Sequence, residues 1–148
     1  MERETLADGT LRLREKDCTL TYTRLRPGVL LVRIIGFDRG ELIREEIEQL
    51  DAELAAHTPL ALLVDLRWAE GATKVVSDAW TEWFRDRKPQ LREVHILVMT
   101  KFLDVTVNVA KLFSRTGELI QVYSDISRFD AAAARLVPGL KQVPPPPP

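Results

Sequence analysis

Short apolar runs alternate with helix-periodic segments through most of the chain, and this alternation constrains the fold more than any other feature. Residues 60–64 are all apolar, and residues 94–99 form a second run that only His95 interrupts. Uninterrupted runs of this length are typical of parallel strands that are buried on both faces. Because parallel neighbours need a long crossover connection, the helical segment between the two runs predicts a sheet with helices packed against it.

Four segments are predicted to be helices. Residues 38–58 carry an apolar stripe at helical spacing, and Asp38 and Glu41 have the spacing of a capping box at its start. Residues 73–88 form the second helix, and a fourth begins at candidate caps within residues 124–127. Residues 103–114 fit both strand alternation and helical spacing. We assign them to a helix, with Gly117 as its C-terminal cap, because the chain needs another crossover.

Strand patterns precede and follow these helices. Residues 10–14, 18–23 and 29–35 are joined by short turns, and residues 118–123 form the last strand. We therefore expect an α/β fold with a mixed, mostly parallel central sheet of about five to six strands, an N-terminal antiparallel meander and about four helices. Residues 1–140 are expected to form one domain, and residues 141–148, which end in consecutive prolines, an extended and disordered tail.

Charge and cysteine content narrow the classes of function. The 21 lysines and arginines nearly cancel the 22 acidic residues, so no strong field attracts nucleic acid. Cys18 is the only cysteine and cannot form an intrachain disulfide. The N-terminal residues lack the apolar run of a signal peptide, and no apolar stretch is long enough to span a bilayer. We expect a cytoplasmic protein with no integral membrane segment.

Three segments in fixed order carry a family resemblance. Residues 26–38 form an apolar strand that ends at a glycine turn, residues 62–66 read Leu-Leu-Val-Asp-Leu, and residues 109–125 join a helix to a last strand. Over about residues 19–136, the order of elements resembles the STAS-like (anti-sigma-factor antagonist-like) domain superfamily. The resemblance implies a regulatory, bacterial-type signalling module. The tryptophan-rich residues 65–98 also resemble a lipid-associated branch of this superfamily.

The chain departs from the family at the start of the second helix. In regulatory members, a serine in an Asp-Ser-Ser-Gly type motif at this place is phosphorylated by a partner kinase. The matching stretch here, residues 67–76, contains no Ser-Ser-Gly, and its nearest hydroxyl is Thr73, with Ser77 one turn further. The chain thus looks like a divergent member whose usual switch is missing, with Thr73 and Ser77 as candidate phosphorylation sites.

No set of residues is predicted to be catalytic. Nucleophilic catalysis needs a Ser or Cys with a base in reach, but Cys18 lies in a predicted strand, far in sequence from both histidines, His57 and His95. These residues also lack the paired short spacing of a zinc site. Gly36 and Gly40 fit a tight turn better than a phosphate loop, since no Lys-Ser or Lys-Thr follows. We expect no enzyme activity, no metal and no cofactor.

The loop after residues 60–64 is the predicted partner-binding region. Asp65 ends a core strand at the sheet edge where open α/β folds bind ligands, although we favour a role in capping the following loop or helix. Trp68 lies in this loop and is hard to bury, and exposed aromatics usually mark a contact surface. The partner-binding candidates are Asp65, Arg67, Trp68, Glu70, Thr73, Lys74 and Ser77.

Two functions compete at this point. The first is a non-enzymatic regulatory or protein-interaction module. The formation of a homodimer is compatible with this function. The alternative is a carrier or sensor of a small apolar, lipid-like ligand, held in a pocket between helices by Trp80, Trp83, Phe102 and Phe113. The polyproline tail is either a disordered end or a ligand for an aromatic groove.

Overall fold

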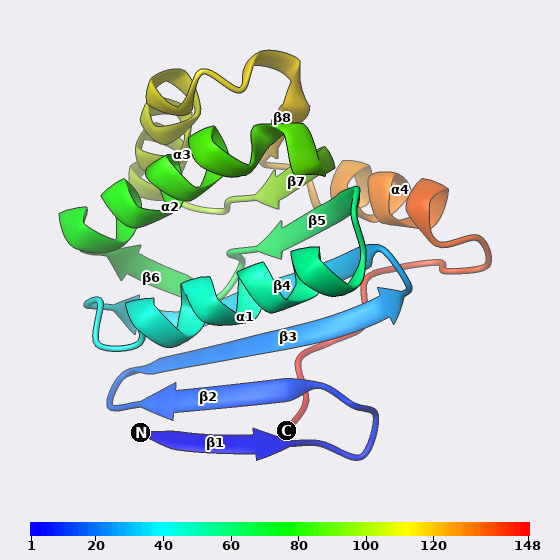
Figure 1. Ribbon diagram of the computed structural model, residues 1–148, viewed down its shortest axis with the longest axis horizontal. Coiled ribbons are helices and arrows are strands. Elements are labelled where there is room, and N and C mark those ends of the chain that lie inside the picture. Colours follow the sequence, from blue (N-terminus) through cyan, green and yellow to red (C-terminus); the bar gives the residue numbers. More distant parts are fainter.

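An eight-stranded mixed sheet forms the centre of the computed structural model, which describes residues 1–148 (Figure 1). The strands are β1 (Glu2–Thr5), β2 (Leu11–Glu15), β3 (Cys18–Arg26), β4 (Val29–Asp38), β5 (Leu60–Asp65), β6 (Ala69–Ala72), β7 (Leu91–Leu97) and β8 (Ile120–Tyr123). Strands β1 to β4 are an antiparallel meander, and β4, β5, β7 and β8 run parallel in that order. The predicted mixed sheet and its meander are therefore confirmed.

The strand count is higher than the five to six that the sequence suggests, because two short strands lack an apolar pattern. Strand β1 is exposed at every position and pairs at the sheet edge. Strand β6, with the sequence Ala-Glu-Gly-Ala, pairs with the end of β4 through the registers Gly36 to Ala69 and Asp38 to Ala72. Neither segment has the alternation that would have predicted a strand.

Helices cover both faces of the parallel half of the sheet. Helices α1 (Ile43–Ala56), α2 (Lys74–Arg87) and α3 (Lys101–Ser114) pack on one face, and α4 (Ile126–Leu136) packs on the other (Figure 1). Along β4, Leu30 and Val32 join the larger core under the first three helices, whereas Val29 and Leu31 join the smaller core under α4. Burial of both faces explains why these strands read as continuous apolar runs.

The ambiguous residues 103–114 form a helix, as predicted. The side chain of Thr100 accepts a hydrogen bond from the backbone N–H of Leu103, 3.2 Å away, and so caps its start. The predicted C-terminal cap at Gly117 is wrong, because the helix ends earlier. Arg115 is the residue in the left-handed conformation (φ 56°), and its N–H donates to the Leu112 carbonyl.

The predicted capping box at the start of the first helix is also wrong. Asp38 still belongs to β4, where it pairs with Ala72 of β6, and its Oδ1 accepts from the backbone N–H of Gly40, 3.0 Å away. The helix begins later, at Ile43, and no side chain caps it. The strand pairing of Asp38 therefore overrides the local capping signal.

Two carboxyl groups are buried between β4, α1 and α2. Asp38 and Glu46 are 1% and 0% exposed, and the neighbouring indole N–H of Trp80 has no hydrogen-bond partner. Burial, together with the adjacent Asp38, raises the pKa of Glu46 to about 10, so Glu46 holds its proton at neutral pH. Burial also raises the pKa of the nearby Cys18 thiol to about 12, which suits a small core side chain and not a nucleophile.

Residues 141–148, the segment that the sequence predicts as a disordered tail, return from α4 across the back of the sheet. The backbone N–H of Val143 donates to Asp130 on α4, and its side chain packs with Val29 and Leu31. The segment forms no regular secondary structure and ends beside β1 and β2, on the side of the sheet opposite α1 (Figure 1).

Candidate partner-binding site

The predicted site begins where β5 ends, at the buried carboxylate of Asp65. Its Oδ2 accepts from Arg33 Nε of the neighbouring β4 at 3.2 Å and from Arg67 Nη2 at 3.3 Å, while its Oδ1 accepts from the backbone N–H of Arg67. Asp65 and Arg33 are 0% and 1% exposed. The carboxylate thus caps the following loop and pairs with a buried cation, so it is not open to a partner.

Arg33 is the residue of this cluster that the sequence-based site prediction missed. It interrupts an otherwise apolar strand, and it lies directly opposite Asp65 in the parallel register of β4 and β5. A buried cation needs a counter-charge, so the interruption of the apolar run together with Asp65 on the next strand was the available signal.

Trp68 lies over the outer end of this ion-pair cluster. The guanidinium carbons of Arg67 and Arg33 are 4.7 and 5.6 Å from its ring centroid, which is cation–π distance. The ring is still 38% exposed. The two arginines hold Trp68 in place from below and leave part of the ring facing solvent, so Trp68 is available for contact.

The remaining polar residues that are candidates for partner binding lie either in the loop or along a groove. Glu70 on β6 and Lys74 at the start of α2 are exposed, whereas Thr73 and Ser77 are half-buried. Thr73, Lys74 and Ser77 form one wall of a groove of about 780 Å³ between α2 and α3. The opposite wall belongs to α3 and includes Phe102, Val105, Val109 and Phe113.

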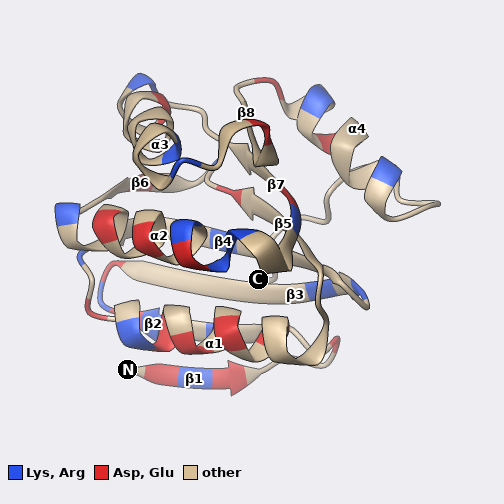
Figure 2. Ribbon diagram, turned by 45° about the horizontal axis from the view of Figure 1, so that its top comes forward, with Lys and Arg blue, Asp and Glu red and all other residues tan.

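Helix α3 is unusual because most of its large apolar side chains face solvent. Only Leu103 and Ser114 are buried in its 14 residues. Phe102, Phe113 and Leu112 are 61%, 63% and 74% exposed, and Val105 and Val109 are about half exposed. In Figure 2, bands of opposite charge mark α1 and α2, while much of α3 carries neither sign. We call the row of Phe102, Val105, Val109, Leu112 and Phe113 the α3 apolar face.

Basic side chains in the last turn of α2 and directly after it contact the end of α3. Arg85 Nη2 donates to the Phe113 carbonyl at 3.3 Å, and Lys88 Nζ donates to the Arg115 carbonyl at 3.1 Å. Cations at this place complement the free carbonyls and the negative end of the α3 dipole. Arg85 also lines the groove, together with Phe113.

An apolar cavity of about 90 Å³ lies beneath the groove, between α2, α3 and the sheet. Its walls are almost entirely hydrophobic and include Val64, Trp80, Phe84, Leu103 and Val107. Of the four predicted pocket residues, Trp80 lines this cavity, while Phe102 and Phe113 line the outer groove. Trp83 lines neither and packs against Trp80 and Phe84, with its indole N–H donating to Asp51 at 2.9 Å.

A second polar cluster lies on the α4 side of the sheet. His95 Nε2 is 2.7 Å from Glu93 Oε1, and His95 Nδ1 is 2.7 Å from the Tyr123 hydroxyl. Because an ionised carboxylate only accepts, His95 donates to Glu93 through Nε2. Arg135 of α4 also pairs with Glu93. His95 and Asp65 therefore have separate partners and do not form one site.

Metal and membrane features complete the description of the candidate sites. No group of three or more His, Cys, Asp or Glu side chains is placed to hold a metal ion. None of the helices combines the length and the apolar character that crossing a bilayer requires.

Two solved structures share this arrangement of strands and helices. An uncharacterised protein of the DUF3478 family from Shewanella loihica, described as having a SpoIIAA-like fold, superposes with a TM-score of 0.55 at 15% identity, covering 86% of this chain and 91% of that protein. An anti-sigma factor antagonist from Mycobacterium paratuberculosis superposes with a TM-score of 0.56 at 16% identity, covering 83% and 99%. No family model matches the chain, and no curated protein matches its sequence. The fold is therefore STAS-like, as the order of elements predicts.

Proposed function

We propose that this protein is a non-enzymatic regulatory module, and that it binds a protein partner through the α3 apolar face and the adjoining α2–α3 groove. The observation that carries the proposal is the exposure of large apolar side chains in one row along α3, with Phe102 and Phe113 each more than 60% exposed. Contiguous exposed apolar patches are rare on monomeric proteins and commonly mark interaction sites.

The chemistry around the α3 apolar face suits a protein partner. Aromatic side chains dominate the energetic centres of protein interfaces, and a polar rim surrounds those centres. Phe102 and Phe113 would supply the aromatic contacts at the two ends of α3. Lys74 and Asp78, which form an exposed ion pair on the opposite wall, would supply the rim.

Similarity in fold to an anti-sigma factor antagonist supports a regulatory role. The family's serine switch is not part of the proposal, because the Ser-Ser-Gly motif is missing from residues 67–76. Thr73 could replace it only after local opening, since its Oγ1 is buried without a hydrogen-bond partner. Ser77 is half-buried and would also need the groove to widen. A cytoplasmic location belongs to the same proposal.

Affinity purification from the native cell tests the proposal. The chain with Phe102→Ser and Phe113→Ser should lose the partner, whereas Ala55→Ser, on the exposed side of α1, should retain it. A third chain, with Trp68→Ala and Thr73→Ala, reports whether the β5–α2 loop contributes. Recovery of the same proteins with the α3 variant would overturn the proposed surface. A second copy of the chain as the captured partner would appear as a dimer in sedimentation experiments.

The second candidate function is a carrier or sensor of a small apolar ligand. It is favoured by the hydrophobic cavity of about 90 Å³ beneath the groove, which Trp80 and Val107 help to line. Dry apolar cavities bind small apolar molecules, but this one would hold only a few methylene groups unless α3 moved outward. Mass spectrometry of the denatured protein should then detect a co-purified apolar molecule, and Ala110→Leu, which fills the cavity wall, should reduce it. Consistent absence of such a molecule would argue against this function.

A further inference from the structure

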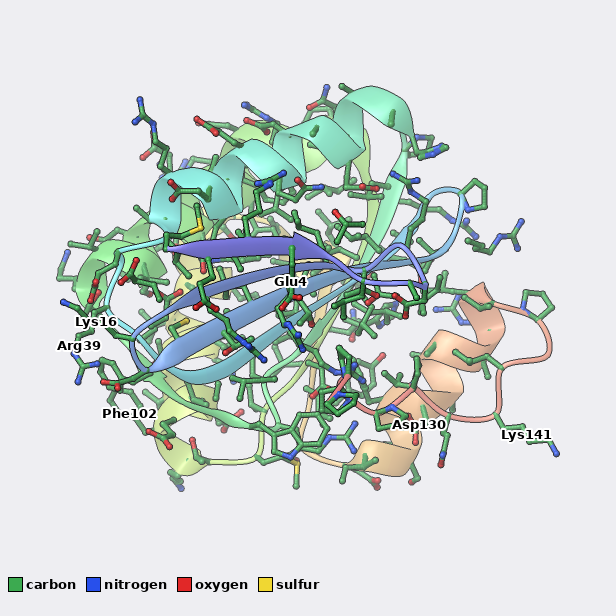
Figure 3. The ribbon with its side chains drawn as sticks, turned by 90° about the horizontal axis from the view of Figure 1, so that it is seen from below. Glu4, Lys16, Arg39, Phe102, Asp130 and Lys141 are labelled. Carbon is green, nitrogen blue, oxygen red and sulfur yellow. The ribbon has the colours of Figure 1, made fainter.

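The C-terminal tail lies on the α4 side of the sheet and continues from α4 toward β2. Figure 3 shows α1 on one side of β2 and β3, and the tail with α4 on the other. The tail is fixed at both ends. At its start, Val143 is buried and donates its backbone N–H to Asp130 Oδ1 at 2.9 Å. At its end, Arg12 Nη1 of β2 donates to a backbone oxygen of Pro148, the last residue of the sequence, at 2.8 Å.

The surface on this side of β2, β3 and β4 is a row of buried polar side chains. Arg12 lies opposite Thr21, Thr21 opposite Arg33, and Arg33 opposite Asp65 in the strand registers. Each of the four is at most 9% exposed. One guanidinium atom, Arg33 Nη2, is buried with no hydrogen-bond partner. We call Arg12, Thr21 and Arg33 the donor row, because each can donate a side-chain hydrogen bond.

A proline segment is chemically complementary to such a row. Proline has no backbone N–H, so residues 144–148 offer carbonyl oxygens that accept and no backbone groups that donate. An extended polyproline segment also makes no internal hydrogen bonds, which leaves all its carbonyls free for donors. Its backbone is stiff before it docks, so little conformational entropy is lost on binding. Pro144, Pro146 and Pro147 are half-buried here, whereas Pro145 and Pro148 are exposed.

We propose that the donor row is a binding site for extended, proline-rich segments of a partner protein, and that the chain's own tail, which bonds Arg12 but leaves Arg33 Nη2 without a partner, occupies it incompletely in cis. The tail therefore acts as an internal competitor that a partner's proline-rich segment replaces. This site lies on the opposite side of the sheet from the α3 apolar face, so it is independent of the function proposed above.

The test uses the full-length chain with residues 144–148 replaced by Ser-Gly-Ser-Gly-Ser, and a fluorescent peptide with the sequence of residues 142–148. This variant should bind the peptide saturably. The wild-type chain should bind it at least about tenfold more weakly, because a tethered tail has an effective concentration in the millimolar range. A peptide with alanines in place of the prolines should not bind. Equal binding by the two chains, or by neither, would overturn the proposal.

Two further measurements place the peptide on the donor row. In the Ser-Gly variant, Arg12→Ala should abolish peptide binding, while Arg44→Ala, on α1 across the sheet, should not change it. Because loss of the buried Arg12 could also unfold the protein, amide NMR shifts provide a second readout. The amides of Arg12, Thr21 and Arg33 should shift in the Ser-Gly variant and return toward their wild-type positions when peptide is added.

The alternative occupant is an acidic peptide attracted by the two arginines. Tighter binding of a polyglutamate peptide than of the proline peptide would refute a proline-specific site. The changes Phe102→Ser and Phe113→Ser should leave peptide binding unaltered, so failure here and failure of the α3 apolar face are separable.

Discussion

Arg33 and Asp65 face each other across neighbouring parallel strands, with Arg33 Nε 3.2 Å from Asp65 Oδ2 and both side chains excluded from solvent. The pair joins the middle of β4 to the end of β5, from which the loop carrying Trp68 begins. A buried ion pair gains little net stability over apolar side chains of similar size, but removal of one partner leaves a buried charge uncompensated. Replacing one residue of the pair should therefore cost more stability than replacing both.

Asp65→Ala is expected to lower the free energy of unfolding by about 3–5 kcal/mol, because Arg33 would stay buried without its carboxylate. Arg33→Met combined with Asp65→Leu should cost much less than the single change. Urea unfolding followed by tryptophan fluorescence measures both. As a control, Arg39→Met removes an exposed ion pair with Asp17 and should cost about 1 kcal/mol or less. Similar losses for the single and double variants would contradict the ion-pair explanation.

Glu46 should make the protein less stable as the pH rises. Its pKa is about 10 in the folded protein, against an ordinary value of 4.5, because it is buried and stands beside Asp38. The folded state therefore binds a proton that the unfolded chain releases, so this contribution is complete below about pH 4.5 and is lost as the pH rises toward 10. Glu46→Gln should stabilise the protein by a few kcal/mol at mildly alkaline pH and little at pH 4.

Chemical unfolding at several pH values checks this expectation. Glu48→Gln, an exposed position on the same helix, is the matched control and should show no such pH dependence. A wild-type stability that does not fall between pH 5 and 9 relative to Glu46→Gln would mean that Glu46 is ionised in the fold.

Thr73 and Thr100 both stand immediately before a helix, but only one of them caps it. Thr100 Oγ1 accepts from the Leu103 N–H, whereas Thr73 Oγ1 is buried without a hydrogen-bond partner. Thr100→Val should therefore cost about 1 kcal/mol. Thr73→Val should be neutral or stabilising, because it removes an unsatisfied buried hydroxyl. Thermal unfolding of the two variants makes the comparison, and equal losses would show that Thr73 also caps.

The sequence predicted the layers of this fold well, because they follow from periodicity. Residues 60–64 fit a buried strand, and residues 103–114 became a helix for the topological reason that favoured it. The capping role of Asp38 and the existence of β6 could not be predicted, because both depend on a pairing between segments far apart in sequence. The capping signal of Asp38 failed because β6 pairs with the end of β4 there, and β6 has no pattern of its own.

The site was predictable in part for a similar reason. The position of Trp68 in a loop indicated exposure, and the structure leaves its ring partly open. Asp65 was expected at the same site, but its burial depends on Arg33, which comes 32 residues earlier in the chain. The exposure of α3 could not be inferred, since an apolar helix in a sequence ordinarily indicates a buried one.

Leu103 and Leu112 provide a direct test of which side of α3 belongs to the core. Leu103 is 3% exposed and lines the apolar cavity, whereas Leu112 is 74% exposed. Leu103→Ala should therefore lower the free energy of unfolding by about 2–5 kcal/mol, and Leu112→Ala by less than about 0.5 kcal/mol. Both changes carry the same loss of helix propensity, so the difference reports burial alone. Urea unfolding of the isolated protein measures it, and a large loss for Leu112→Ala would mean that the α3 apolar face is covered in solution, by another part of the chain or by a second copy.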